Sequence, residues 1–436
     1  MKGKTAVLIA AAAFSFAASA KPWLKGTTDK CPLDYKAGET MAFTLTLERA
    51  EGLPEGLSID WKRTGDDGKT ESGKVPAKPG EPLCIKTSLD RPGFVRIFAV
   101  LRKADGSVWT PDGKPASKGR DGGYPRGVFF DGGAGVDVAS IRQSVPEPAD
   151  FDEFWARHKA ALAAVPMTDV KLEELPSKNP AVKIYAVSIP CAGPKPATGY
   201  LVVPTKEGKF PAVISFHGYG ASWSKKATAA PDGTWHKGDA VKLILSAHGF
   251  ELNRDPAYYR AEHAKVKSNG HGHAFDPEQN SDPEKAYFCG MTYRVMRGLE
   301  YLKSRPEWNG RNLTVSGASQ GGLQSIWGAA LVPGVTAANI QIPWCCDMGG
   351  TSVGRNHGPW YVKWVPALGY YDPVNMARRI PKTCRVDVLR AGIGDYTCPP
   401  TGVAAFYNNL SCPKKIVWVQ GSTHGYVPPE REAYER

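Results

Sequence analysis

Short apolar runs alternate with segments of helical periodicity from about residue 180 to the C-terminus. Buried strands that alternate with helices are typical of a parallel sheet covered on both faces. The strand-like runs are VKIYAVSIP, GYLVVP, PAVISFHG, VKLILSAHG, LTVSGAS, ANIQIPW, VDVLRAG and KKIVWV. The helix-like segments are AYFCGMTYRVMRGLEYLKSR, QGGLQSIWGAALV and GVAAFYNNL. We therefore predict an α/β fold with a mostly parallel central sheet over residues 136–436.

Residues 21–135 follow a different pattern, in which apolar and polar residues alternate over short runs between turn sequences. In TMAFTLTLERA, Phe43, Leu45 and Leu47 alternate with threonines, as in a strand with one buried face. Several such runs favour a small all-β sandwich of the immunoglobulin-like kind. The sequence DGGAG that follows suits a linker. The predicted sandwich offers no catalytic cluster, so we expect an accessory role for it.

The first 20 residues have the features of a signal peptide. Lys2 and Lys4 precede an apolar run that ends in Ala18-Ser19-Ala20, a small-x-small cleavage pattern. The run is shorter than the roughly 20 residues that cross a bilayer, and no other window comes close. We therefore expect residues 1–20 to be removed, the mature protein to be exported to the periplasm or outside the cell, and no stable membrane insertion.

The formal net charge is +12, but its Lys and Arg residues are dispersed along the chain. Nucleic-acid-binding proteins commonly gather basic residues on one helix or stripe. We therefore expect no nucleic-acid partner, and a solvated basic surface that suits acidic polysaccharides.

Nine cysteines are many for an exported protein, in which disulfides can form. Cys31 and Cys84 flank strand-like runs of the N-terminal segment, so we predict that they pair. Cys384 with Cys412 is a second candidate pair, since each precedes a candidate strand. No cysteine spacing resembles a zinc site. The sequence therefore predicts no metal and no cofactor.

The residues Gly317-Ala318-Ser319-Gln320-Gly321 match G-x-S-x-G between the strand-like LTVSG and a helix-like segment. In a nucleophile elbow the serine has a strained backbone, and small neighbours let the strand and the helix pass close enough to expose its hydroxyl. The strand before and the helix after make this match more specific than the pattern alone. We predict Ser319 as the nucleophile of an α/β-hydrolase.

A serine nucleophile needs a base and an orienting carboxylate, which follow it in the order Asp or Glu, then His, in α/β-hydrolases. Asp395 comes just after the strand-like VDVLRAG, and His424 comes just after KKIVWV. Both therefore occupy loops where the topology needs them. The other carboxylates after Ser319 have structural interpretations, and His357 precedes the last two strands. The competing carboxylates are Asp347, Asp372 and Asp387.

An acyl-transfer site also needs donors for the oxyanion. The backbone N–H of Gln320 is one candidate, because Gln320 follows the nucleophile and begins a helix. The loop sequence VISFHGYGA offers a second donor through the N–H of Tyr219. His217 of the same loop is interpreted as structural, since the loop presents its backbone.

The motifs FHGYG, GASQGG, IPWCCD, GDYTCPP and GSTHG resemble those of the acetyl xylan esterase/cephalosporin C deacetylase family. The sequence PEPADFDEFWARH also resembles the family's first helix, so the likeness runs from about Pro146 to Tyr426. It implies an α/β-hydrolase that removes acetyl groups from acetylated sugars without a metal. By position, it implies a nucleophile at Ser319, partners at Asp395 and His424, and oxyanion donors at Tyr219 and Gln320.

Three features depart from the family's usual pattern. Ala247-His248-Gly249 stands where the family usually has Arg-Gly-Gln, and His424-Gly425 stands where it usually has His-Glu. The N-terminal β region is the third departure, because compact members of the family lack it.

Aromatic residues between positions 220 and 287, and again near 360, could either stack on sugar rings or anchor loops. These substrate-binding candidates are Trp223, Trp235, Tyr258 and Trp360. His271-Gly272-His273 lacks a third ligand at metal spacing and is interpreted as a mobile polar loop.

Together these features predict a secreted serine carboxylesterase that removes O-acetyl groups from acetylated oligosaccharides or polysaccharides such as xylan. Two alternatives stay open: another α/β-hydrolase activity, as in a peptidase or a lactone hydrolase, or a non-catalytic carbohydrate-binding protein. The sequence also leaves open a homo-oligomer.

Overall fold

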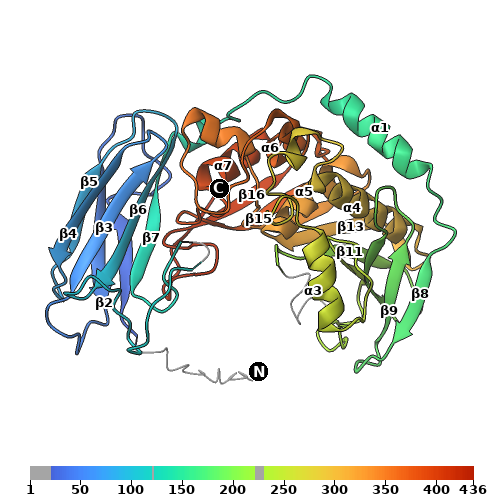
Figure 1. Ribbon diagram of the computed structural model, residues 1–436, viewed down its shortest axis with the longest axis horizontal. Coiled ribbons are helices and arrows are strands. Elements are labelled where there is room, and N and C mark those ends of the chain that lie inside the picture. Colours follow the sequence, from blue (N-terminus) through green and yellow to red (C-terminus); the bar gives the residue numbers. More distant parts are fainter. Residues whose placement is uncertain (1–20, 120–121, 221–229) are drawn as a thin grey trace, which may run out of the picture.

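The computed structural model describes residues 21–119, 122–220 and 230–436. Two regions lie side by side in it, an all-β region near the N-terminus and an α/β region that contains the rest of the chain (Figure 1). This arrangement confirms the predicted fold class. The predicted signal peptide, residues 1–20, lies outside the described residues, as does Trp223.

Two small antiparallel sheets form the N-terminal region, which we call the β-sandwich (residues 23–136). Apolar side chains such as Phe43, Leu45 and Ile97 fill its core, as the alternating pattern predicts. One sheet has the order β1 (Trp23–Thr28), β2 (Met41–Glu48) and β5 (Leu83–Thr87). The other has the order β4 (Thr70–Pro76), β3 (Ser58–Gly65), β6 (Gly93–Arg102) and β7 (Phe129–Val136).

Strand β7 contains the sequence DGGAG, which the sequence analysis interpreted as a linker. All eight residues of β7 are buried, so this interpretation is wrong. The glycines are needed because the neighbouring chain leaves no room for side chains. A Cβ on Gly133 would lie 2.0 Å from the carbonyl oxygen of Val95.

The second region is built on a ten-stranded sheet whose six central strands, from β12 to β16 in the sheet, are parallel. Strands of one direction end at the same edge, so the loops after β11, β13, β15 and β16 gather there. In sheet order the strands are β17 (Ala433–Glu435), β16 (Lys414–Val419), β15 (Arg385–Gly392), β14 (Ala337–Gln341), β13 (Trp308–Ala318), β11 (Phe210–Phe216), β12 (Val241–Leu245), β10 (Ala197–Pro204), β9 (Val182–Ile189) and β8 (Lys171–Leu175).

Helices pack on this sheet and bury their apolar faces. A Cβ on Gly328 would lie 2.9 Å from Leu299, so a glycine lets two of the helices approach closely. The helices are α1 (Phe151–Ala163), α3 (Pro256–Lys265), α4 (Tyr287–Ser304), α5 (Gln320–Leu331), α6 (Pro373–Met376) and α7 (Pro400–Asn409). Short 3₁₀ helices are η1 (Val138–Ser140), η3 (Gln279–Ser281), η4 (Met348–Val353), η5 (Pro366–Tyr370) and η6 (Ala377–Arg379).

All nine cysteines are free thiols in the structure, so the predicted Cys31–Cys84 disulfide is not formed. Cys84 lies in β5, which is separated from β1 by β2. Two strand spacings are about 9–10 Å, which exceeds the Cα separation that a disulfide spans. Cys31 follows β1 and instead receives a hydrogen bond from Arg436. Cys384 and Cys412 precede the paired strands β15 and β16 as thiols.

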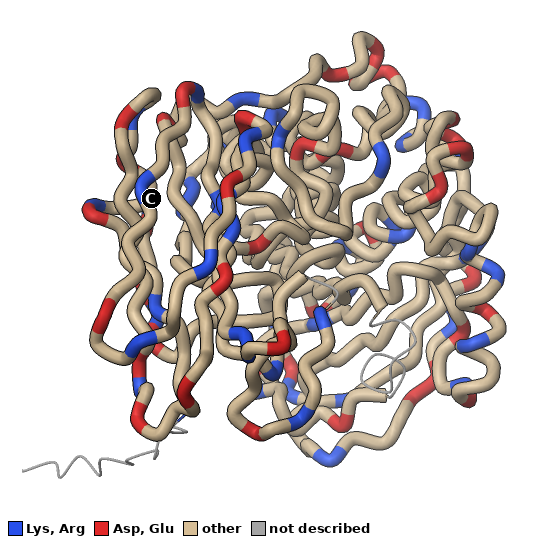
Figure 2. The backbone as a smooth tube through the Cα atoms, turned by 60° about the vertical axis from the view of Figure 1, so that its left-hand side comes forward, with Lys and Arg blue, Asp and Glu red and all other residues tan. Residues whose placement is uncertain are grey.

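Basic and acidic residues are interspersed over both regions (Figure 2), as the dispersed charge of the sequence predicts. Among the described residues, no helix combines the length and the apolar character that crossing a membrane requires.

Candidate active site

Ser319 lies between the last residue of β13 and the first residue of α5. Its backbone has φ 59° and ψ −121°, a conformation that residues with a side chain rarely adopt. The backbone is held on both sides: the Ser319 N–H donates to Gln341, and the Ser319 carbonyl accepts from Trp344. The strain is therefore fixed by the surrounding strands and presents the side chain at the end of the sheet.

The two glycines of the motif have the steric role that the sequence suggests. A Cβ on Gly317 would lie 2.4 Å from the backbone of Gly321, across the turn. A Cβ on Gly321 would lie 2.3 Å from the carbonyl oxygen of Phe216 in β11. Strand and helix can therefore pass each other only because neither position carries a side chain.

Asp395 and His424 come together at the same edge of the sheet. His424 Nδ1 lies 2.9 Å from Asp395 Oδ2. The other carboxylate oxygen of Asp395 accepts the N–H groups of Thr397 and Cys398, each at 3.0 Å. Asp395 is 1% exposed, while the His424 side chain is 23% exposed. The carboxylate is thus held by its own loop, and the imidazole reaches the surface.

Sequence reasoning missed two further residues that support this pair. Arg390 of β15 donates to the carbonyl of His424. The Cys398 thiol lies 3.7 Å from His424 Nδ1 and donates to the carbonyl of Ile342. Burial raises the pKa of Cys398 well above its ordinary value, and the charge of Asp395 adds to the shift. The thiol therefore stays protonated.

The competing carboxylates have structural partners. Asp347 pairs with Arg355, and Asp387 pairs with Arg385. Asp372 accepts the N–H of Val374 at the start of α6, as expected of a helix cap.

Asp372 also accepts the N–H groups of Asp347 and Met348. Burial raises the pKa of Asp372 to about 7, and the charge of Asp347 contributes to the shift. His357 bonds to the carbonyl of its neighbour Gly358. These groups have partners elsewhere, and Asp395 is the carboxylate that the fold pairs with His424.

The loop after β11 passes beside the elbow. A Cβ on Gly218 would lie 3.9 Å from Cβ of Ser319, so the backbone next to Tyr219 approaches the serine. The Tyr219 ring stacks on His273, with centroids 3.9 Å apart and planes 8° apart. Its hydroxyl donates to the His273 carbonyl. This stacking holds the loop in a fixed position, as backbone donors require.

His273 was interpreted from sequence as part of a mobile polar loop, and the structure corrects this. The side chain is fully buried, and Nε2 lies 2.9 Å from Oε1 of Gln320. Burial lowers the pKa of His273 to about 3, so the ring is neutral. His248, the departure from the family pattern, lies against it with ring centroids 4.6 Å apart. No sequence spacing signals these contacts, because they join separate loops.

His217 lies in the same loop after β11, and its interpretation as a structural residue stays a prediction. Burial lowers the pKa of its ring, and its backbone carbonyl accepts a hydrogen bond from Gln324.

The aromatic residues predicted to stack on sugars lie in different parts of the structure. Trp360 packs edge-on against Tyr219, with centroids 5.0 Å apart, and so belongs to the site. Trp235 lies under the ammonium of Lys242, near the beginning of β12, at the opposite edge of the sheet from the elbow. Tyr258 of α3 contacts Tyr259 and Arg254 of its own segment. The structure therefore brings only Trp360 of the three described candidates to the elbow.

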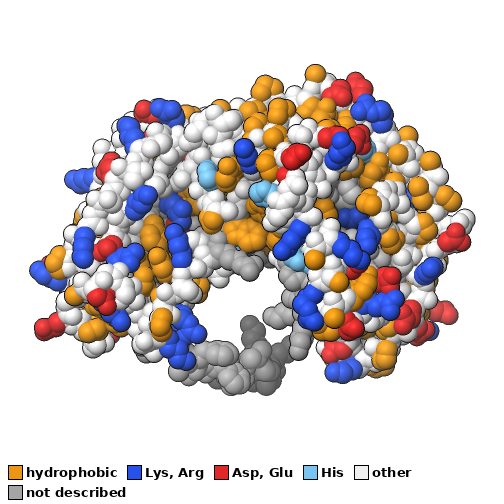
Figure 3. Space-filling model, in the orientation of Figure 1, with side chains coloured by type: hydrophobic (Ala, Val, Ile, Leu, Met, Phe, Trp, Pro, Cys, Tyr) orange, Lys and Arg blue, Asp and Glu red, His pale blue; other side chains and the backbone are white. Residues whose placement is uncertain are grey.

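A small cavity of about 50 Å³ lies beside this edge, within the loop that follows β14. Trp344 and Trp360 contribute to its wall, together with Thr397 and Pro399 from the Asp395 loop. The face of the molecule is also hollowed between the β-sandwich and the α/β region (Figure 3).

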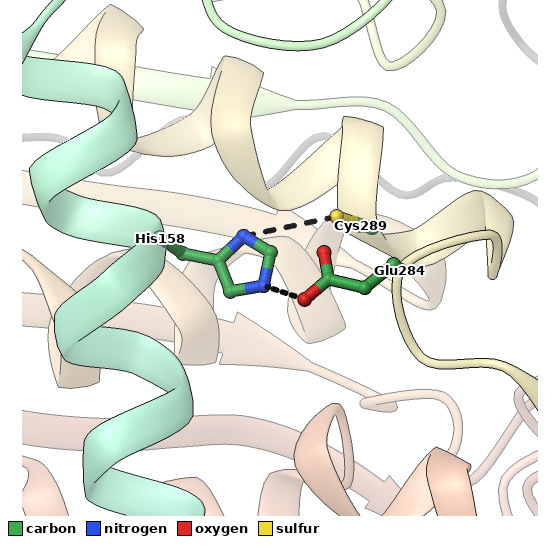
Figure 4. A group of neighbouring side chains, drawn as sticks. All are labelled: His158, Glu284 and Cys289. Atoms are coloured by element: carbon green, nitrogen blue, oxygen red, sulfur yellow. Dashed lines mark hydrogen bonds and ion pairs between the residues drawn. The ribbon is translucent and has the colours of Figure 1, made fainter.

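A separate cluster joins α1 to α4, far along the chain from the elbow (Figure 4). His158 Nε2 lies 3.2 Å from Glu284, and Nδ1 lies 2.6 Å from the Tyr293 hydroxyl and 4.0 Å from Cys289 Sγ. The carboxylate and the thiol thus lie at opposite ring nitrogens. This arrangement suits hydrogen bonds that hold α1 against α4 better than the binding of one metal ion.

The family model described as acetyl xylan esterase (AXE1) matches residues 137–353 and 361–435, which is more than half of the chain. The chain belongs to the acetyl xylan esterase family. The match begins just after β7 and contains Ser319, Asp395 and His424.

A similar protein extends the comparison. The acetyl esterase Axe7A of Xylanibacter ruminicola is 27% identical over 400 residues, which cover 87% of this chain and 82% of the relative. This likeness therefore reaches beyond the acetyl xylan esterase match into the β-sandwich.

Two solved acetyl xylan esterases share the fold. The enzyme of Paenibacillus sp. R4 has a TM-score of 0.55 at 24% identity and covers 67% of this chain and 94% of its own. Acetyl xylan esterase 1 of Thermoanaerobacterium sp. JW/SL YS485 has a TM-score of 0.54 at 22% identity and covers 67% and 93%.

Proposed function

We propose that the protein is an exported serine carboxylesterase that removes O-acetyl groups from acetylated carbohydrates such as xylan or xylooligosaccharides. The observation that carries this proposal is the strained Ser319 at the sheet edge where Asp395 holds His424. Membership of the acetyl xylan esterase family supports an acetyl ester as substrate. The signal-like residues 1–20 support export.

In the proposed reaction, the Ser319 hydroxyl attacks the acetyl carbonyl carbon while His424 Nε2 accepts its proton. Asp395 Oδ2 accepts the hydrogen bond of His424 Nδ1, which fixes the tautomer that leaves Nε2 free to act as a base. The imidazolium then protonates the departing sugar oxygen. Water repeats the sequence on the acetyl-serine, and acetate leaves.

The backbone N–H groups of Tyr219 and Gln320 are the proposed donors to the oxyanion. Gln320 N–H lies at the first turn of α5, where the helix dipole favours negative charge. The Tyr219 loop passes beside Ser319. Loss of one such donor typically costs about 10²- to 10³-fold in rate.

The decisive experiment is acetate release from acetylated xylooligosaccharides by wild type and Ser319→Ala. We expect Ser319→Ala to lower kcat by a factor on the order of 10⁴ or more, with an unchanged thermal midpoint. A serine-directed phosphonate should label Ser319 in the wild type. Unchanged ester turnover in Ser319→Ala, or no labelling of Ser319, contradicts the esterase proposal.

The same assay separates the alternatives. Turnover of a peptide or lactone panel without acetate release would assign the elbow to a different hydrolase. Binding of xylooligosaccharides with no turnover of any ester would assign the chain to carbohydrate binding.

A further inference from the structure

The β-sandwich touches the loop that carries Asp395. A Cβ on Gly394 would lie 1.7 Å from the carbonyl oxygen of Asp131 in β7, so the two backbones are in direct contact. The next residue after Asp395, Tyr396, is 2% exposed. The loop is therefore enclosed between its own sheet and a strand of the other region.

An ion pair of the β-sandwich lies behind this loop. Arg96 of β6 holds Asp131 of β7 through two hydrogen bonds, of 2.7 Å from Nε and 2.6 Å from Nη2. Asp131 is fully buried, and the Arg96 side chain is 16% exposed. The Arg96 guanidinium carbon lies 4.4 Å from the centroid of the Tyr396 ring. The positive charge thus packs on the residue next to the predicted catalytic carboxylate.

The same charge interacts with the site electrostatically. Burial by itself lowers the pKa of Arg96, but Asp131, Tyr396 and Asp395 together raise it above its ordinary value. The charge of Arg96 therefore lies close enough to Asp395 to interact with it. The other charged or titratable groups that face this carboxylate are Arg390, Cys398 and His424.

The His424 side of the pair is attached to β7 as well. The Gln420 side chain accepts from the N–H of Gly133 at 3.0 Å and donates to the carbonyl of Gly133 at 2.8 Å. β7 is the last strand of its sheet, and the Gln420 side chain makes the hydrogen bonds that a further strand would make to Gly133. Because Gln420 directly follows β16, the chain that leads to His424 begins from a residue fixed to the β-sandwich.

A third contact reaches the loops around the cavity. Asp66 of the β-sandwich accepts the N–H of Asn356 at 2.8 Å and the hydroxyl of Thr401. Asn356 also donates to the Thr64 hydroxyl at 2.9 Å. Asn356 and Thr401 both line the cavity beside the elbow. Three separate groups of the β-sandwich therefore support the loops at this edge of the sheet.

We propose that Arg96, with Asp131, is a positioning residue for the Asp395–His424 pair, so that the β-sandwich is part of the support of the active site. This inference rests on the proposed esterase function. It assigns the N-terminal region a role in turnover, where the sequence alone suggests an accessory region.

The test measures kcat and KM for acetate release by the full-length Arg96→Ala, Arg96→Gln and Arg96→Lys variants. We expect kcat to fall about 10- to 100-fold in Arg96→Ala, with KM changed less than about twofold, since Arg96 lies behind the loop. Arg96→Lys should recover part of kcat.

Arg102→Gln is the matched control, because Arg102 lies on the same strand and pairs with Asp60 within the β-sandwich. Arg96→Gln keeps a donor for Asp131 and therefore carries the test with less risk to folding. A wild-type kcat in Arg96→Gln overturns the inference, as does an equal loss of kcat in Arg102→Gln. Activity of Ser319→Ala would instead overturn the esterase proposal, so the two failures are distinguishable.

Discussion

Strands β4 and β7 are the two edges of one four-stranded sheet, yet their surroundings are opposite. Residues of β4 are mostly exposed, whereas every residue of β7 is buried. An uncovered edge strand invites pairing with other chains, and polar or charged residues discourage it. β4 has the polar sequence TESGKVP, while β7 has FFDGGAGV. The comparison shows that β7 is built to be covered by the α/β region.

The largest effect is expected where β7 meets the Asp395 loop. Gly394→Ala places a Cβ against the backbone of Asp131, which cannot move without distorting both regions. We expect a loss of unfolding free energy at or above the roughly 1–3 kcal/mol of overpacked cores, together with a loss of kcat. Gly73→Ala in β4 meets only the Trp61 side chain, which is partly exposed and can turn away. Equal denaturation midpoints for the two variants would contradict this account.

A smaller effect is expected from the hydrogen bonds at the same edge. Gln420→Ala leaves the buried N–H and C=O of Gly133 without their partner and should cost about 1–3 kcal/mol of unfolding free energy. Thr70→Ala removes an exposed side chain of β4 and should change stability by less than about 0.5 kcal/mol. Urea denaturation measures both changes in unfolding free energy. An equally small loss in Gln420→Ala and Thr70→Ala would mean that the hydrogen bonds of Gln420 to β7 do not stabilise the fold.

Adjacent aspartates give a pH test of the same contrast. Asp67 pairs with buried Arg63 inside the β-sandwich; burial alone would raise its pKa, but Arg63 lowers it below the ordinary value of 3.8. Asp66 faces the α/β region, and burial raises its pKa above 3.8 despite its hydrogen bonds. Asp67 therefore contributes stability above about pH 4 that is lost as pH falls through its folded pKa. The stability that Asp66 contributes is fully present below about pH 3.8 and is lost as pH rises through its folded pKa.

Stability against pH should therefore change in opposite senses in the two variants. Relative to wild type, Asp67→Asn should be least stable near neutral pH and should approach wild type in acid. The stability of Asp66→Asn relative to wild type should be highest above the folded pKa of Asp66 and lowest in acid. Thermal midpoints measured from pH 3 to 7 check this, and parallel curves for both variants would contradict the assigned environments.

Much of the α/β region could be predicted because its signals are local. Eight strands could be predicted from apolar runs, and the strained turn at Ser319 follows from glycines that leave room for it. Asp395 and His424 follow from the order of strands, and the structure places them in contact. The edge strands β8 and β17 were missed because their exposed residues carry no apolar pattern.

The contacts between regions could not be predicted, because no sequence pattern encodes them. Glycines in β7 resemble a linker until the backbone of the opposing loop is known. Gln420 resembles a loop residue until Gly133 of β7 is placed beside it. Arg96 is one of many dispersed basic residues, and only the fold sets it against Tyr396.

The rate at which a serine-directed phosphonate labels Ser319 tests the central claim most directly, since it reports activation of the nucleophile without substrate binding or product release. Wild type and Arg102→Gln should label Ser319 at the same rate, and Arg96→Gln should label it about tenfold more slowly. Labelling of Arg96→Gln at the wild-type rate, or no labelling of Ser319 in the wild type, would contradict the account.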